Sequence, residues 1–121
     1  FLQDGEWTGY YCYASPMFGQ GTPFDPPMVG VRFDVTDVAH DSNQYGLHSD
    51  GQDACGKFKL EGRLFRDSGV LALRKTYTPG PTWHWAALMT PFGIVGSWGQ
   101  ASWGVGNGWV WLWKREWCGE E

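Results

Sequence analysis

Apolar and polar residues alternate along most of this chain, and the alternation predicts β-strands. In a strand, successive side chains point to opposite faces, so every second residue shares an environment. The alternation is clearest at the end of the sequence, where one predicted face carries Trp109, Trp111, Trp113 and Trp117. The same pattern predicts eight strands, at Glu6–Tyr13, Met28–Val38, Gln44–His48, Cys55–Arg66, Val70–Tyr77, Thr82–Met89, Gly93–Trp98 and Gly108–Trp117.

Short connections between these segments favour antiparallel pairing of sequential strands. The 121 residues form one predicted domain, 1–121, and the 18 glycines and seven prolines suit turns rather than helices. Eight antiparallel strands are enough to close an up-and-down barrel around one small ligand. We therefore predict an all-β, closed or nearly closed barrel. A seven-stranded sandwich also suits short strands, but it does not need so many indoles on the last strand.

The nine tryptophans belong either to an aromatic core or to the wall of a ligand cavity. For the cavity, we expect a pocket for a small apolar or sugar-like ligand beneath the long connection Ala14–Pro27, which is either a lid or an ordered rim loop. The candidate lining residues are Trp83, Trp85, Trp98, Trp109, Trp111 and Lys75.

Lys75 has two possible orientations, because a slip of one residue reverses the faces of a strand. A two-residue hairpin at Ser68–Gly69 would turn Lys75 inward with Leu64, whereas a three-residue loop would turn Arg74 inward. An inward cation would attract an anionic or carbonyl group of a ligand. Alternatively, it would be a buried, paired structural cation or a side chain that reaches solvent.

Gly5-Glu6-Trp7 opens the first strand, and Arg115 lies near the end of the last. The first and last strands of a closed barrel are neighbours, so Arg115 could stack on Trp7 and plug one end. In these features the chain resembles the calycins, the group of barrels that includes lipocalins and avidins. That resemblance implies the Trp7–Arg115 plug, in its avidin-like version, because no residues remain for the helix that follows a lipocalin barrel.

Two further resemblances concern function. Gly5–Tyr11, Lys75–Tyr77 and Met89–Trp98 are similar to a calycin-type domain of fungal proteins and some F-box substrate receptors, which implies a grip on a peptide end. The whole chain is similar in length and character to a sweet-tasting fungal protein. This implies a secreted, non-enzymatic protein that a sweet taste receptor recognises at its surface. The net charge of −4 departs from the basic sweet proteins of plants.

Three cysteines leave one thiol unpaired within the chain. In an up-and-down barrel, the end of the first strand and the start of the fourth meet at one rim. Strand parity therefore predicts a Cys12–Cys55 disulfide at the rim of the long first connection. Cys118 would lie at the opposite rim as a free thiol, available for a dimer with a second molecule.

Composition narrows the remaining possibilities. The acidic balance argues against nucleic acid, and no apolar run is long enough to span a membrane. The first residue is Phe rather than Met, which favours either a removed signal peptide and secretion or an excised piece. His40, Asp41, His48, Asp50 and Asp53 are close in sequence but lack metal-ligand spacing, so we predict a solvated loop without a metal. We expect no catalytic residues and no cofactor.

Overall fold

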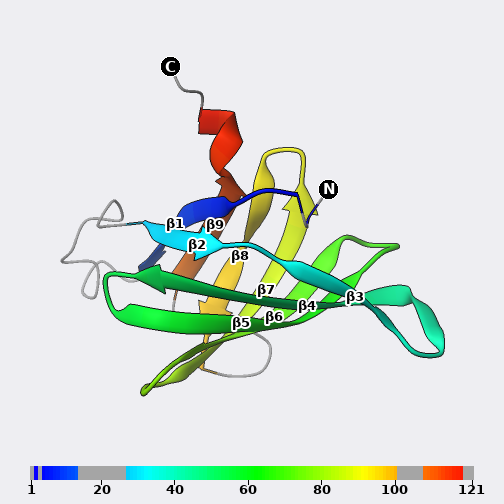
Figure 1. Cartoon of the computed structure of the whole chain (residues 1–121), viewed down its shortest axis with the longest axis horizontal. Helices are drawn as coiled ribbons and strands as arrows, with labels where there is room; N and C mark the ends of the chain where they lie inside the picture. The colour runs from blue at the N-terminus through cyan, green and yellow to red at the C-terminus, as the bar shows by residue number, and fades with distance from the viewer. Residues whose placement is uncertain (1, 3, 14–26, 101–107, 119–121) are drawn as a thin grey trace.

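The chain forms a closed, antiparallel up-and-down barrel, as the alternation predicted (Figure 1). The computed structural model describes residues 2, 4–13, 27–100 and 108–118. Its strands are β1 (Trp7–Tyr13), β2 (Met28–Val31), β3 (Asp34–Val38), β4 (Asp41–Asp53), β5 (Gly56–Phe65), β6 (Val70–Tyr77), β7 (Thr82–Thr90), β8 (Gly93–Gly99) and β9 (Gly108–Lys114). A 3-10 turn, η1 (Arg115–Cys118), follows β9. Within the described ranges, no helix has the length and apolarity needed to cross a bilayer.

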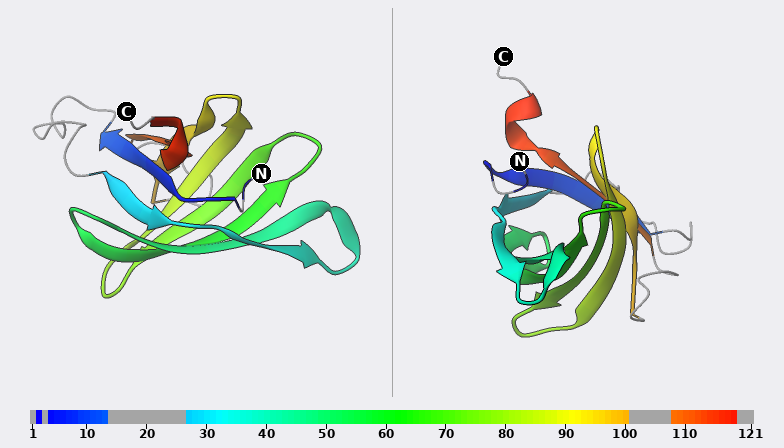
Figure 2. Two further views of the ribbon diagram at one scale, coloured as in Figure 1. Left: turned by 45° about the horizontal axis from the view of Figure 1, so that its top comes forward. Right: turned by 90° about the vertical axis from the view of Figure 1, so that its right-hand side faces the viewer.

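The barrel closes where the first strand meets the last. β1 pairs with β9 from Trp7↔Lys114 to Tyr13↔Gly108. On the other side of β1, β2 pairs with β1 and also with β4, through Val29↔Gln52. The sheet therefore curls back on itself and encloses one interior, as the two views in Figure 2 show.

The predicted strand Met28–Val38 is interrupted, so that β2 and β3 together fill one of eight places around the barrel. Gly30 has φ +78°, and the β1–β2 register shifts between Trp7 and Gly9, which marks a β-bulge. The extra residue changes the alternation: Met28 and Val31 are both buried, whereas Val29 is exposed. Uninterrupted alternation over the predicted strand Met28–Val38 would put Val29 and Val31 on one face, and the bulge makes that expectation wrong.

β4 is much longer than predicted. The expected segment Gln44–His48 is the middle of a 13-residue strand that runs on to Asp53. Its second half carries Ser49, Gly51 and Asp53 at the inward positions, so hydrophobic alternation stops although the strand continues. This extension brings an acidic side chain to the mouth of the barrel.

Glycine allows strands to approach closely where the barrel curls. A Cβ atom on Gly9 would lie 1.9 Å from the carbonyl oxygen of Trp111, and one on Gly62 would lie 1.9 Å from that of Ala72. Any larger residue at either position would push the neighbouring backbone away. Both glycines point inward, and they help the wall to bend around a narrow interior.

One end of the barrel is plugged by Trp7, but the cation above it is Lys114 rather than Arg115. The Lys114 ammonium lies 5.7 Å from the centre of the buried Trp7 ring and donates a hydrogen bond to the Asp4 carbonyl oxygen. β9 alternates Val110, Leu112 and Lys114 inward, so Arg115 falls outside the wall, 3.6 Å from Glu6. The predicted Trp7–Arg115 contact is wrong, because the inward cation is the residue before Arg115.

Replacing Lys114 with Met should lower the free energy of unfolding by about 1–2 kcal/mol, because a desolvated cation–π contact and a hydrogen bond are lost. Arg115→Ala is the matched control, and it should change stability by less than about 0.5 kcal/mol since its ion pair is exposed to solvent. Urea denaturation monitored by tryptophan fluorescence measures both. A larger effect of the Arg115 substitution would contradict the assignment of the plug.

Candidate functional site

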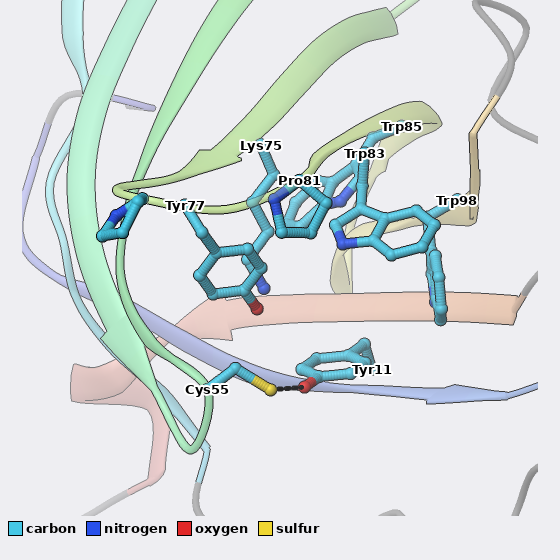
Figure 3. Close-up of a pocket in the computed structure, with 9 residues that line it drawn as sticks. Tyr11, Cys55, Lys75, Tyr77, Pro81, Trp83, Trp85 and Trp98 are labelled. Carbon is cyan, nitrogen blue, oxygen red and sulfur yellow. Dashed lines mark hydrogen bonds between the residues drawn. The ribbon is translucent and has the colours of Figure 1, made fainter.

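A pocket opens at the rim opposite the plug. It lies where β1 ends, where β4 turns into β5, where β6 turns into β7 and where β8 ends. Its volume is about 240 Å³, slightly below the roughly 300–1,000 Å³ usual for drug-sized ligands. The lining residues are Tyr11, Cys55, Lys75, Tyr77, Pro79, Pro81, Trp83, Trp85 and Trp98. Figure 3 shows Tyr11 and Cys55 on one side, with Lys75, Tyr77, Pro81 and Trp83 facing them.

A buried ion pair forms the base of this pocket. The Lys75 ammonium lies 2.6 Å from Asp53 Oδ2, and the Tyr77 hydroxyl donates to the same oxygen at 2.6 Å. The other carboxylate oxygen, Oδ1, accepts the Cys55 backbone N–H at 2.9 Å. Both oxygens of Asp53 are thus occupied by donors that come from β6 and from the β4–β5 turn.

The Lys75 ammonium is also surrounded by aromatic rings. It lies 4.4 Å from the centre of Phe58, 4.5 Å from Tyr11 and 5.0 Å from Tyr77, which is within the range of cation–π attraction. Burial lowers the pKa of Lys75 below its ordinary value, although the neighbouring Asp53 carboxylate opposes this change. The protein therefore supplies its own cation to this group of aromatic rings, in the form of the Lys75 ammonium.

Two phenols at the site are held in their neutral form. Burial is the main cause that raises the pKa of Tyr77, and its hydrogen bond to Asp53 and the negative charge of that group add to the effect. Burial also raises the pKa of Tyr11, whose hydroxyl lies 3.4 Å from the Cys55 sulfur. Both residues therefore keep a hydroxyl hydrogen throughout the physiological range.

The indole wall is well ordered by its own contacts. The Trp83 and Trp98 rings meet edge to face at 5.1 Å, and Tyr11 meets Trp98 edge to face at 5.8 Å. The Trp98 indole N–H donates to the carbonyl oxygens of Cys12 and Trp109, at 3.2 and 3.1 Å. Because these hydrogen bonds fix the orientation of Trp98, the apolar wall is present before any ligand arrives.

The structure brings together four of the six residues predicted to line a pocket: Lys75, Trp83, Trp85 and Trp98. The connection between β5 and β6 has four residues, which gives the parity of a two-residue turn and so turns Lys75 inward. The expected lid, Ala14–Pro27, lies outside the described residues except for Pro27.

Trp109 and Trp111 do not line the pocket, and this part of the prediction is wrong. Trp109 and Trp111 are 59% and 48% exposed on the outer wall of β9, whereas Val110 between them and Leu112 after them are buried. Alternation placed these indoles on one face of the strand but could not identify which face is the inner one. The buried Gly108 and Lys114 share the phase of Val110 and Leu112, and the small size of Gly108 leaves room for the Trp98 ring.

The predicted Cys12–Cys55 disulfide is absent, and both thiols are free. Strand parity correctly placed the two cysteines at one rim, but they lie on different sides of the wall. Tyr11, the residue before Cys12, points inward and contacts Cys55, so Cys12 points outward. Cys118 belongs to η1 at the opposite end of the barrel, as parity predicted.

The sequence interpretation missed Asp53, Tyr77 and Tyr11 as site residues. Asp53 was assigned to a solvated acidic loop, but its side chain has no exposed area. A signal for it existed: an inward lysine needs a carboxylate partner when buried. Within the described ranges, no group of three His, Cys, Asp or Glu side chains forms a metal-sized cluster.

The arrangement is suited to holding a ligand by stacking and by a small number of polar contacts. Comparison with known proteins adds no identity: the chain matches no protein family, no curated protein and no solved structure.

The raised pKa values of Tyr11 and Tyr77 predict how stability depends on alkaline pH. Unfolded tyrosine ionises at about pH 10, so above that pH the native state keeps protons that the unfolded state loses. The stability from these two phenols is complete below about pH 10 and is lost as pH rises further. Lys75 has the opposite sign, because its lowered pKa makes the unfolded state bind more protons up to about pH 10.4.

We therefore expect the free energy of unfolding to fall steeply above about pH 10.5, where the contribution of Lys75 has ended. Tyr77→Phe should make the slope of this fall smaller, by the amount that corresponds to about one proton fewer released on unfolding. Urea denaturation at a series of alkaline pH values measures the slope. Equal slopes for the wild type and the variant would remove Tyr77 from this explanation.

Proposed function

We propose that this protein is a non-enzymatic binding barrel that holds a small, flat ligand in the pocket between Tyr11, Tyr77, Trp83 and Trp98. The observation that carries the proposal is the aromatic cavity of about 240 Å³ at one rim of the barrel. Aromatic faces bind apolar rings and the C–H faces of sugars, and the few polar groups at the base would orient such a ligand.

Several features of the site support binding rather than packing alone. The exposed Cys55, Pro79 and Pro81 lie at its mouth, so the cavity communicates with solvent. The Trp98 ring is fixed by two hydrogen bonds to backbone carbonyls, so little ordering is required when a ligand enters. The resemblance to calycins, whose barrels hold small ligands or peptide ends, is consistent with this function.

Indole is a suitable first probe, because it is flat, neutral and small enough for the cavity. We expect saturable binding, detected as shifts of the Trp83, Trp85 and Trp98 indole N–H resonances in NMR spectra. Trp83→Ala should weaken it by about tenfold or more, as truncation of a buried aromatic contact does at binding sites.

Trp111→Ala is the matched control, because it removes an indole of the same size from the outer wall. It should leave the affinity for indole unchanged. If indole fails to shift the pocket resonances, or if the two substitutions weaken it equally, the pocket is not the binding site.

The outer wall supports a second proposal, recognition by a sweet taste receptor, in line with the resemblance to a sweet-tasting fungal protein. Aromatic side chains are enriched where proteins bind one another, and several are exposed on the outer wall of this barrel. Among the described residues from β7 to η1, the exposed large apolar side chains are Leu88, Phe92, Trp109, Trp111 and Trp117. Such recognition implies a secreted protein that acts through its surface.

For this second function, the expected result is the reverse of that for indole binding. In cells that express the sweet taste receptor, the double substitution Trp109→Ala and Trp111→Ala should lower potency by about tenfold. Trp83→Ala should leave potency unchanged. A calcium-release assay measures both, and a receptor response that depends on Trp83 alone would assign the activity to the pocket instead.

A further inference from the structure

We propose that the pocket selects neutral ligands that carry a carbonyl or hydroxyl oxygen, that it rejects carboxylates, and that Asp53 sets this selectivity. The inference rests on the ligand-binding function proposed above and concerns the chemical class of the ligand. Its basis is that the two charged groups at the base of the cavity, Lys75 and Asp53, already pair with each other.

The positive charge of Lys75 is already matched inside the protein. Its ammonium lies 2.6 Å from Asp53 Oδ2, and both side chains are buried. Asp53 cannot turn aside to release it, because the Tyr77 hydroxyl and the Cys55 backbone N–H hold the same carboxylate at 2.6 and 2.9 Å. The base of the pocket is therefore a neutral pair rather than a free cation.

A carboxylate ligand would have to lose its water among aromatic rings without gaining an unmatched cation in return. If it bound the Lys75 ammonium, it would also lie near the negative charge of Asp53, and repulsion between two carboxylates is unfavourable in a low-dielectric site. A cationic ligand meets the opposite problem, because Lys75 already lies 4.5 Å from the Tyr11 ring and 5.0 Å from the Tyr77 ring. Both classes of ion are disfavoured.

A neutral oxygen, by contrast, improves the contacts of Lys75. Beyond Asp53, its donors face the Met28 sulfur at 3.6 Å and the ring of Phe58 at 4.4 Å, which are weak acceptors. A carbonyl or hydroxyl oxygen from a ligand is a stronger acceptor and introduces no net charge. Of the two groups that Lys75 was expected to attract, the site favours the carbonyl over the anion.

Benzamide and benzoate test this directly, since they share one ring and differ in the amide and the carboxylate. Titration at about pH 6, followed by the pocket indole N–H resonances, gives both affinities. In the wild type, benzamide should bind at least about tenfold more tightly than benzoate. Equal binding, or a preference for benzoate, would overturn the proposal without the need for any variant.

Asp53→Asn then tests the selectivity residue, because it removes the internal counter-charge and keeps the shape. Benzoate should gain at least about tenfold in affinity, while benzamide changes by less than about threefold. The control is Asp50→Asn, which makes the same change in net charge at an exposed position of β4 and should alter neither affinity. An unchanged ratio in Asp53→Asn would assign the selectivity to another group.

A double variant identifies the charge on which the gain depends. Adding Lys75→Met to Asp53→Asn removes both charges, and the improved benzoate binding should disappear. If the double variant still binds benzoate tightly, Lys75 is not the attracting group and the proposal fails. If indole binds but the amide and carboxylate preference is reversed, the ligand-binding function survives and only this inference falls. If no probe reaches the pocket, both fall.

Discussion

The Asp53–Lys75 ion pair is the interaction on which the mouth of the barrel depends. Through one carboxylate it ties the end of β4, the turn to β5 and both inward polar residues of β6 into a single network. Removing one partner of a buried pair typically costs about 3–5 kcal/mol, because the other charge stays behind without compensation. Asp53 is therefore the group that stabilises a charged lysine inside this aromatic cavity.

The tryptophans serve the protein in two different ways. Inside the barrel, Trp7 closes one end beneath Lys114, while Trp83, Trp85 and Trp98 line the opposite mouth. Trp109 and Trp111 are exposed on the outer face of β9, whereas Val110 and Leu112 of the same strand are buried in the core. The same residue type is thus placed by strand parity in either a dry interior or an exposed wall. Each location has its own chemistry, and the aromatic content of the chain alone does not distinguish them.

The fold followed from the sequence because alternation is a local property. It identified the eight places around the barrel and its closed form, although it merged β2 with β3 and found only the middle of β4. What the sequence could not supply was phase. The row of indoles on β9 suggested the inner face. The inner face is instead the less aromatic one, which carries Gly108, Val110, Leu112 and Lys114. Asp53 escaped notice for a related reason, because the inward positions before it, Ser49 and Gly51, are not hydrophobic. Choosing between faces requires the long-range pairing that only the closed sheet provides.

The short strand β2, which carries the bulge at Gly30, is the most weakly paired strand of the described wall. Within the described part of the chain, β2 and β4 share a single pair of Cα partners, Val29↔Gln52, whereas β4 and β5 share ten. Local opening of a protein begins where few backbone hydrogen bonds and contacts must be broken. With β1, β2 shares only two such pairs, Trp7↔Val31 and Gly9↔Met28, so this short strand is weakly held on both sides. We therefore expect the amide hydrogens around β2 to be the least protected from exchange in a wall that has no free edge.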